Sequence, residues 1–192
     1  MLASGAIVVT SVPFRFTCVL DAQGQDVAVG QEGEICAEGP SLHLGYHANP
    51  TANAEAFTAD GWFRTGDLGH LDQQGFLYIT GRASDMYISG GSNVYPKEVE
   101  EVLLTHPGVA EIAIVGMPDS KWGEIGIAVI VKRAGVEDVN EAALLAYLDG
   151  RCAKYRWPRQ IIFWDVMPKS GYGKIVKKDI KVLLVEQGFV PA

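Results

Sequence analysis

Two short apolar runs in the first half of the chain each end at a charged side chain. Asp67 follows Phe63-Arg64-Thr65-Gly66, just past a glycine expected to end a strand, and Arg82 follows Ile79-Thr80-Gly81. An ionised carboxylate only accepts hydrogen bonds, so it can hold both hydroxyls of a cis-diol such as ribose. Arginine offers a planar fork of donors to phosphate or ribose oxygens. The alternative is a Gly-Asp turn and a surface arginine paired with Asp67 or Asp85.

A glycine-rich segment follows these residues at Ser89-Gly90-Gly91-Ser92. Glycine lacks Cβ and permits positive φ, so this backbone could approach a ligand or another chain closely. The segment is not a phosphate-binding GxxxxGK[ST] loop, and the sequence contains no match to that pattern.

A second glycine-bracketed loop, Pro168 to Gly173, leads to Lys174 and a last helix. A mobile loop could bring the lysine ammonium to an anionic transition state, where charge placed in advance stabilises more strongly as water is excluded. The alternative is a solvated turn lysine. Lys177 and Lys178 are expected on a solvated helix face. Three glutamates in an earlier helix are expected to serve its dipole and solubility: Glu98, Glu100 and Glu101.

Residues 1–80 are predicted to be rich in strands. β-branched or aromatic runs separated by turn clusters predict a small barrel or twisted sheet. The expected strands are Ala6–Thr10, Phe14–Leu20, Glu34–Glu38, Gly61–Thr65 and Phe76–Thr80. One short helix is expected up to about Phe57, with Asn49 or Thr51 near its start.

Residues 93–192 are predicted to alternate in the order α-β-β-α-β-α, which gives a three-stranded sheet backed by helices. The expected helices are Pro96–Leu104, Glu141–Ala153 with Asn140 as a cap and Ala142, Leu145 and Leu148 facing inward, and about Lys177–Gln187. The expected strands are Val109–Val115, closing at Met117-Pro118-Asp119, then Gly126–Lys132 and Gln160–Trp164. The predicted class is therefore α+β, with a barrel-like subdomain followed by a compact α/β domain.

Composition excludes several function classes. The 192 residues are 48% hydrophobic and 20% charged, with net charge −7 and no basic run longer than Lys177-Lys178, so no nucleic-acid partner is expected. Three cysteines without CxxC spacing favour neither a disulfide framework nor a zinc site and fit a reducing cytoplasm. The four histidines show no ligand spacing, so no metal site is expected. The start of the chain lacks signal-peptide features, and its apolar runs are too short for a membrane span.

The motifs become specific through their order. Trp62-Phe63-Arg64-Thr65-Gly66-Asp67-Leu68, Gly81-Arg82-Ala83-Ser84-Asp85, Gly90 to Glu100 and Gly171-Tyr172-Gly173-Lys174 together resemble the adenylate-forming acyl-CoA synthetase family over nearly the whole chain. The resemblance implies that a carboxylic acid attacks the α-phosphate of Mg-ATP, giving an acyl-adenylate. The thiol of coenzyme A (CoA) then attacks the acyl carbonyl and releases AMP.

The resemblance also implies a role for each residue. Asp67 would bind the ribose hydroxyls, and Arg82 the ribose or phosphate. Lys174 would contact the carboxylate and α-phosphate oxygens during adenylation. A rotation of the small domain about Ser84 and Asp85 would then withdraw the lysine and bring Ser89, Gly90 and Gly91 against the pantetheine of CoA. The hinge position is often Asp or Lys in the family and is Ser84 here.

The family's phosphate loop, its adenine- and Mg²⁺-binding segment and its acyl pocket have no match in this sequence. We therefore expect a C-terminal portion that is inactive alone, with Mg²⁺ ligands outside it. The expected parts are 1–81 (barrel subdomain), 82–92 (hinge and glycine segment) and 93–192 (C-terminal domain). Residues Met86 to Pro96 most resemble fatty-acyl, aryl and dicarboxyl CoA ligases. The alternatives are the tail of a peptide-synthetase adenylation domain and a non-catalytic binding module. An apolar face exposed on the barrel could support homo-oligomerisation.

Overall fold

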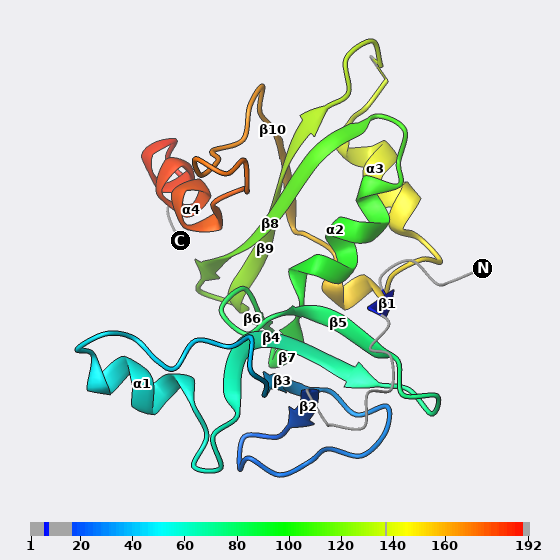
Figure 1. Cartoon of the computed structure of the whole chain (residues 1–192). Coiled ribbons are helices and arrows are strands. Elements are labelled where there is room, and N and C mark those ends of the chain that lie inside the picture. The colour runs from blue at the N-terminus through cyan, green and yellow to red at the C-terminus, as the bar shows by residue number, and fades with distance from the viewer. Residues whose placement is uncertain (1–5, 8–16, 137, 190–192) are drawn as a thin grey trace. The chain divides into compact units, whose positions relative to one another are not determined.

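The computed structural model describes residues 6–7, 17–136 and 138–189. The chain divides into two compact units, Met1–Ser84 and Asp85–Ala192 (Figure 1). Residues 85–92, expected in a separate segment, are thus part of the second unit. The strand positions predicted at 8–10 and 14–16 lie outside the described residues.

The first unit contains a five-stranded antiparallel sheet in the order β1-β5-β4-β3-β2. Its strands are β1 (Ala6–Ile7), β2 (Thr17–Leu20), β3 (Gly33–Ala37), β4 (Phe63–Leu71) and β5 (Leu77–Arg82). Side chains alternate between its faces, as the pleat requires. One face buries Cys18, Leu20 and Cys36, and the other buries Val19, Ile35 and Leu77. The described strands form an open sheet, and their pairings do not establish the barrel-like closure that the sequence predicted.

The strand β4 is longer than predicted. It does not end at Thr65 but continues through Gly66 and Asp67 to Leu71. Backbone pairing carries it on, because Asp67 lies opposite Arg82 and Leu68 opposite Gly81 in β5. A register shift between Leu68 and Gly69 absorbs the irregularity. Asp67 therefore stands within a strand rather than in a turn after one.

The helix α1 (Pro50–Ala56) begins as predicted. The Asn49 side chain accepts a hydrogen bond from the Ala52 N–H at 3.1 Å, and proline occupies the first helical position. No residue of α1 is buried, so the helix contributes little to the core of its unit.

The second unit contains a mixed five-stranded sheet, not the three-stranded sheet predicted. Its strands are β6 (Tyr87–Ser89), β7 (Ser92–Val94), β8 (Val109–Asp119), β9 (Gly123–Lys132) and β10 (Gln160–Phe163). They follow the order β10-β9-β6-β7, with β8 also paired to β9. Only the pairing of β10 with β9 is parallel. The two extra strands are β6 and β7, which consist of three residues each and enclose the two glycines.

Helices cover both faces of this sheet (Figure 1). Val99 and Leu103 of α2 (Pro96–Leu104) and Leu144 of α3 (Glu141–Leu148) pack against residues such as Ile114 and Ile130. Ile180 and Leu184 of α4 (Lys177–Glu186) pack on the other face, against residues such as Val115 and Val129. The order α-β-β-α-β-α is confirmed from α2 onward.

Some element ends differ from the prediction. The strand β8 runs through Pro118, which lies opposite Glu124, because β8 is an edge strand that tolerates a missing N–H. Asn140 caps α3 as predicted, but the helix ends at Leu148 rather than Ala153. Asp149 is extended and Gly150 has φ +72°, so the helix cannot continue. A short 3₁₀ turn, Lys154–Arg156, follows. The buried residues of α3 are Leu144 and Leu148, while Ala142 is exposed.

Candidate functional site

The structure brings Asp67 and Arg82 together in the first unit. Arg82 Nε donates to Asp67 Oδ1 at 2.9 Å, and the two residues are partners in the β4–β5 register. The arginine side chain is 65% exposed and the carboxylate 29%. The pair therefore presents its remaining donors and acceptor at a surface. The structure also contains the Arg82–Asp67 ion pair that the structural alternative predicted.

The backbone before Asp67 is held by polar side chains. Thr65 Oγ1 donates to the Ile35 carbonyl at 2.6 Å and accepts from the Asp67 N–H at 3.1 Å. Arg64 forms a 2.6 Å ion pair with Glu34. A pocket of about 380 Å³ borders this segment and is lined by Glu34, Tyr46, Ala52, Glu55, Ala56, Arg64, Thr65 and Gly66. Asp67 thus follows a fixed segment that lines a concave surface.

The glycine segment of the second unit is a tight β-hairpin. Ser89 of β6 pairs with Ser92 of β7, and the two residues between them have positive φ, +58° at Gly90 and +80° at Gly91. Positive φ at both central positions is typical of a type I′ turn. The Gly90 N–H donates to the Trp122 carbonyl at 2.9 Å, which fixes the hairpin to the start of β9.

Tyr87 packs the β6–β7 hairpin against the rest of the sheet. Its ring is 2% exposed and lies over Gly116 and Gly126, which face each other in the β8–β9 register. A Cβ atom on either glycine would overlap Tyr87, so both positions require the absence of a side chain. Burial, followed by the negative charge of Glu124, raises the pKa of the Tyr87 hydroxyl, which therefore stays neutral.

An aromatic and cationic surface lies beside the hairpin, and the sequence analysis did not identify it. A Cβ on Gly90 would stand 2.8 Å from the ring of Trp122, which is 36% exposed. The Arg159 guanidinium stacks 4.4 Å from the Trp122 ring centre, and Lys121 Nζ lies 5.6 Å from it. The only signal in the sequence is Lys121-Trp122-Gly123, because Arg159 is brought there by β10.

Lys174 lies on the second hairpin of interest. Ser170 N–H donates to the Lys174 carbonyl at 2.8 Å, and Val176 N–H to the Pro168 carbonyl at 3.0 Å. Lys169 and Ile175 form a β-bridge at its base, and Lys169 Nζ is bound to Glu111 at 2.7 Å. Lys174 itself is exposed, and no ion pair holds its ammonium among the described residues. The loop is therefore a closed hairpin that presents one lysine.

Lys177 is not on a solvated face, contrary to the prediction. Its side chain is 21% exposed, and its ammonium contacts Asp85 at 3.1 Å and Glu100 at 2.8 Å. Glu100 does not serve solubility either, because it is 14% exposed and accepts from the Ile114 N–H at 2.6 Å. Glu98 pairs with Arg156. Lys178 is exposed, as predicted.

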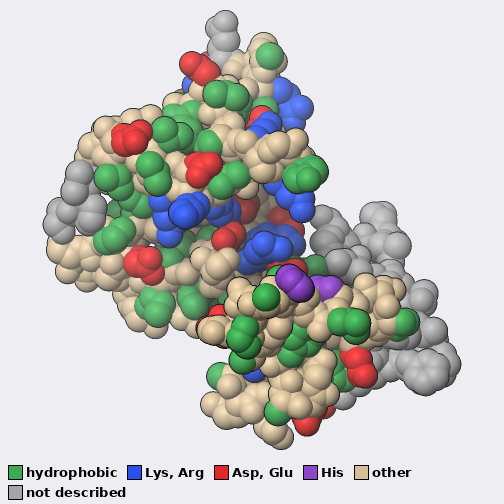
Figure 2. All heavy atoms as spheres, turned by 60° about the vertical axis from the view of Figure 1, so that its left-hand side comes forward, with side chains coloured by type: hydrophobic (Ala, Val, Ile, Leu, Met, Phe, Trp, Pro, Cys, Tyr) green, Lys and Arg blue, Asp and Glu red, His purple; other side chains and the backbone are tan. Residues whose placement is uncertain are grey.

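The predicted residues thus fall into separate groups. Asp67 and Arg82 form one group in the first unit. In the second unit, the hairpin from Ser89 to Ser92 and the hairpin of Lys174 are distinct. Ser84 is the last residue of the first unit and Asp85 the first residue of the second. On the face shown in Figure 2, several lysine and arginine side chains lie close together, with acidic side chains among them, although the net charge of the chain is −7.

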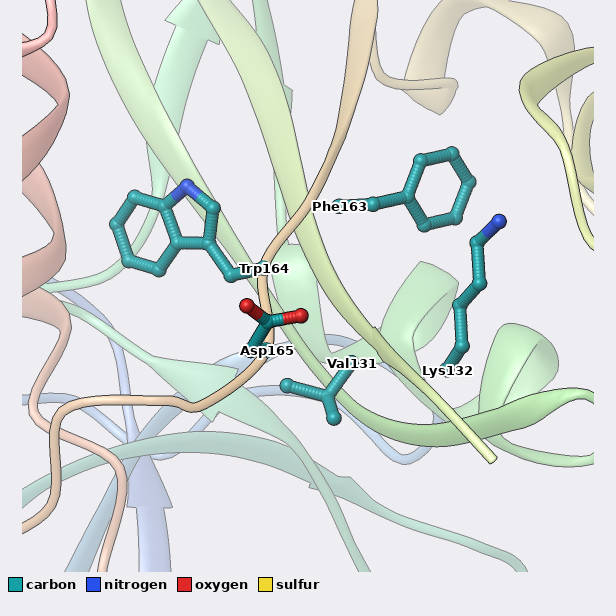
Figure 3. Close-up of a pocket in the computed structure, with 5 residues that line it drawn as sticks. All are labelled: Val131, Lys132, Phe163, Trp164 and Asp165. Carbon is teal, nitrogen blue, oxygen red and sulfur yellow. The ribbon is translucent and has the colours of Figure 1, made fainter. Parts of the chain in front are cut away.

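A further pocket involves none of the predicted residues. It has a volume of about 350 Å³ and lies at the ends of β9 and β10, lined by Val131, Lys132, Phe163, Trp164 and Asp165 (Figure 3). Lys132 Nζ lies 4.4 Å from the centre of the Phe163 ring. The described residues contain no group of three His, Cys, Asp or Glu side chains that could hold a metal ion. No described helix is long and apolar enough to cross a membrane.

Comparison with known proteins identifies relatives of this chain. Residues 98–174 match the family described as the AMP-binding enzyme C-terminal domain. This part of the chain is therefore a C-terminal domain of the AMP-binding enzyme type, as the motifs implied.

Its curated relatives include CoA ligases. The chain is 40% identical over 172 residues to an indoleacetate–CoA ligase of Aromatoleum aromaticum, covering 90% of this chain and 33% of that protein. It is 39% identical over 173 residues to a 2-succinylbenzoate–CoA ligase of Bacillus cereus, covering 89% of this chain and 35% of the relative. The chain therefore spans about a third of the length of these relatives.

Solved structures give the same assignment. ATP-bound MatB from Rhodopseudomonas palustris matches with a TM-score of 0.81 and 38% identity, over 88% of this chain and 33% of that one. The o-succinylbenzoate CoA synthetase of Bacillus subtilis, solved with its acyl-adenylate intermediate, matches with a TM-score of 0.79 and 39% identity, over 85% and 33%. The α+β class predicted from the sequence is confirmed.

Proposed function

We propose that this chain is the C-terminal part of an ATP-dependent ligase that joins a carboxylic acid to the thiol of CoA. The main support for this proposal is the way the hairpin presents Lys174. Neighbouring Lys169 and Lys177 are bound to carboxylates, whereas the Lys174 ammonium is exposed without an ion pair in the described part of the chain. An ammonium held in this way can stabilise negative charge that develops on a substrate.

In the adenylation step, a carboxylate oxygen attacks the α-phosphorus of ATP and pyrophosphate leaves. We assign Lys174 to the carboxylate and α-phosphate oxygens. We assign Asp67 to the ribose hydroxyls, which its carboxylate can accept. The 2.9 Å contact with Arg82 orients that carboxylate and leaves other guanidinium donors for ribose or phosphate. The family's adenine- and Mg²⁺-binding segment has no match in this sequence, so we assign the Mg²⁺ that accompanies ATP to ligands outside this chain.

In the second step, the CoA thiol attacks the acyl carbonyl and AMP leaves. We assign the hairpin of Ser89, Gly90 and Gly91 to the pantetheine, since backbone without Cβ atoms permits close approach. Trp122, with Arg159 stacked on it, offers an aromatic face and positive charge next to Gly90. Such a surface suits the nucleotide and phosphates of CoA.

Because the two steps need different groups, we propose that the second unit moves about Ser84 and Asp85. The unit boundary falls between these residues, and Ser84 is exposed, which supports this assignment. The substrate is proposed to be a fatty, aryl or dicarboxylic acid, and the cytoplasm, where ATP and CoA occur, is the proposed location.

A different acceptor is the second candidate. The amide bond synthetase McbA from Marinactinospora thermotolerans matches with a TM-score of 0.81 and 32% identity, over 87% of this chain. The same fold is thus present in a protein that forms an amide rather than a thioester. A tail of a peptide-synthetase adenylation domain would similarly use another acceptor. Thioester formation with CoA, measured against amide formation with free amines, distinguishes these functions.

The decisive experiment joins this chain to the N-terminal part of MatB in place of the corresponding C-terminal part. A chimera of MatB with BxBclM has been solved with ATP bound. We expect the chimera to release pyrophosphate with ATP and at least one member of a panel of carboxylic acids, and Lys174→Ala to lower this rate about 100-fold or more. Lys178→Met is the matched control and should leave the rate unchanged.

This chain alone should release no pyrophosphate with ATP and a panel of acids. Clear turnover by the isolated chain would refute its assignment as an incomplete catalyst. An active chimera in which Lys174→Ala and Lys178→Met behave alike would refute the role of Lys174.

A further inference from the structure

An unusual lysine begins α4. Lys177 is the first residue of the helix, where a positive charge opposes the helix dipole. Its ammonium is bound by two carboxylates, Asp85 at 3.1 Å and Glu100 at 2.8 Å, and its side chain is only 21% exposed. An exposed lysine would be more favourable elsewhere on this helix. The position therefore indicates a specific interaction rather than solubility.

The two carboxylates fix different parts of the unit. Glu100 lies in α2 and also accepts from the Ile114 N–H of β8 at 2.6 Å, so it is attached to the sheet. Asp85 is the first residue of the second unit. Lys177 therefore connects α4 to the sheet through Glu100 and to the start of the unit through Asp85.

Lys177 is also close in sequence to Lys174. The hairpin base formed by Val176 N–H and the Pro168 carbonyl lies directly before α4. Ile180 and Leu184 fix the remainder of α4 in the core, but its first turn has no side-chain N-cap. The ion pairs of Lys177 thus hold the end of α4 that carries the hairpin.

We propose that Lys177 is a positioning residue that couples Asp85 to the orientation of the Lys174 hairpin. The inference rests on the proposed function, because it supposes that Lys174 acts in adenylation and that Asp85 adjoins the hinge. Lys177 contacts no substrate. It acts by keeping the hairpin base in one orientation relative to the residue at which the second unit begins.

The first test measures amide hydrogen exchange by NMR in this chain. Lys177→Met should accelerate exchange at Ser170 and Val176 about tenfold, while amides in β8 and β9 change less than twofold. Asp85→Asn should accelerate the same two amides, although residue 85 is far from them in sequence. The two changes together should be less than additive. Lys177→Arg, which can still bind both carboxylates, should restore protection.

Lys178→Met is the matched control and should exchange as the wild type does. Equal acceleration across the whole second unit would show a general loss of stability and overturn the proposal. So would hairpin amides that respond to Lys177→Met but not to Asp85→Asn.

The second test uses the MatB chimera. Lys177→Met should lower kcat for pyrophosphate release about tenfold with KM for ATP unchanged within twofold, and Lys177→Arg should recover most of the rate. An unchanged kcat would overturn the positioning role. A wild-type chimera with no activity would instead refute the proposed function, and the exchange measurements would still decide whether Lys177 couples Asp85 to the hairpin.

Discussion

Carboxylates divide the lysines near the end of the chain into two kinds. Lys169 is bound to Glu111, and Lys177 to Asp85 and Glu100, whereas Lys174 and Lys178 are exposed. Sequence alone gives five lysines within thirteen residues, from Lys169 to Lys181, and no means of separating them by pairing. Which lysines are paired depends on carboxylates elsewhere in the second unit: Glu100 in α2, Glu111 in β8 and Asp85 at the start of the unit.

The ion pair of Arg82 supplies the first residue-scale prediction. Because Arg82 is 65% exposed, Arg82→Met should lower the free energy of unfolding by less than about 1 kcal/mol. The measurement is urea unfolding of this chain. In the MatB chimera the same substitution should raise KM for ATP. A large loss of stability with normal adenylation would instead support the purely structural interpretation of the pair.

Arg64→Met is the contrasting variant. Arg64 and Glu34 are only 32% and 22% exposed and lie 2.6 Å apart, and Glu34 also accepts from the Gly66 N–H. Loss of Arg64 leaves a half-buried carboxylate with one weaker partner. It should therefore destabilise the chain more than loss of Arg82, by about 1–3 kcal/mol.

The buried thiol of Cys36 gives a second residue-scale prediction. Burial, followed by the negative charge of Glu34, raises its pKa from 9.0 to about 11. At pH 8 it should resist iodoacetamide until the chain unfolds, while Cys152, which is partly exposed, should react first. Mass spectrometry after timed alkylation is the measurement. Equal rates for the two thiols in the native chain would contradict the burial of Cys36.

The raised pKa of Cys36 also determines how the stability of the folded chain changes with pH. Below pH 9 the thiol is protonated in both the folded and the unfolded chain, so it does not alter stability. Between pH 9 and about 11 only the unfolded chain ionises, and the folded state loses stability as pH rises. Cys36→Ser should reduce this alkaline loss.

At the scale of elements, the two glycines of the β6–β7 turn make a matched pair. Both have positive φ, but a Cβ at Gly90 would meet the Trp122 ring at 2.8 Å, whereas a Cβ at Gly91 would meet nothing within 4 Å. Gly91→Ala should therefore cost about 1 kcal/mol from backbone strain. Gly90→Ala should cost more, because Trp122 must also shift.

Thermal unfolding and tryptophan fluorescence measure this difference. We expect a spectral change for Gly90→Ala and none for Gly91→Ala. In the chimera, Gly90→Ala should slow thioester formation from supplied acyl-adenylate more than it slows pyrophosphate release. The opposite order would argue against a role of this hairpin toward CoA.

How far each element was predictable depends on its length and setting. The helix α2 was predicted to the residue, because Pro96 fixes its start and an apolar face follows. The strands β6 and β7 were missed, since three-residue strands around two glycines look like a loop until β9 pairs with one of them. The end of β4 was misplaced because Gly66 adopts φ +72° without leaving the sheet.

The candidate site followed the same pattern. Asp67, Arg82 and Lys174 were identifiable from motif order, whereas Trp122 and Arg159 were not, because they come together only through the pairing of β9 and β10. The roles of the identified residues remain predictions, which the chimera experiments test.

At the scale of the whole chain, the apolar core is divided unequally. Among the described residues, the first unit buries only Cys18, Val19, Leu20, Ile35, Cys36 and Leu77 as its apolar core, while two larger clusters belong to the second unit. Small cores leave little net stability. We therefore expect residues 85–189 to fold alone with a cooperative thermal transition.

Residues 1–84 alone should unfold at a lower temperature or remain unfolded. Circular dichroism and NMR chemical-shift dispersion of the two separate fragments are the measurements. A stable first fragment with an unfolded second one would contradict the division of the core.

The packing of Tyr87 against two facing glycines, Gly116 and Gly126, limits which substitutions these positions can accept during evolution. These three residues constrain one another, because the Tyr87 side chain from β6 occupies the space that side chains at Gly116 of β8 and Gly126 of β9 would need. A side chain at Gly126 would overlap the hydroxyl end of Tyr87, so it becomes tolerable only after the tyrosine has been replaced by a smaller residue. A side chain at Gly116 would overlap the Cβ of Tyr87, which any replacement except glycine keeps. Residue 126 can therefore change only after the tyrosine has changed, whereas residue 116 must stay glycine as long as residue 87 carries a Cβ.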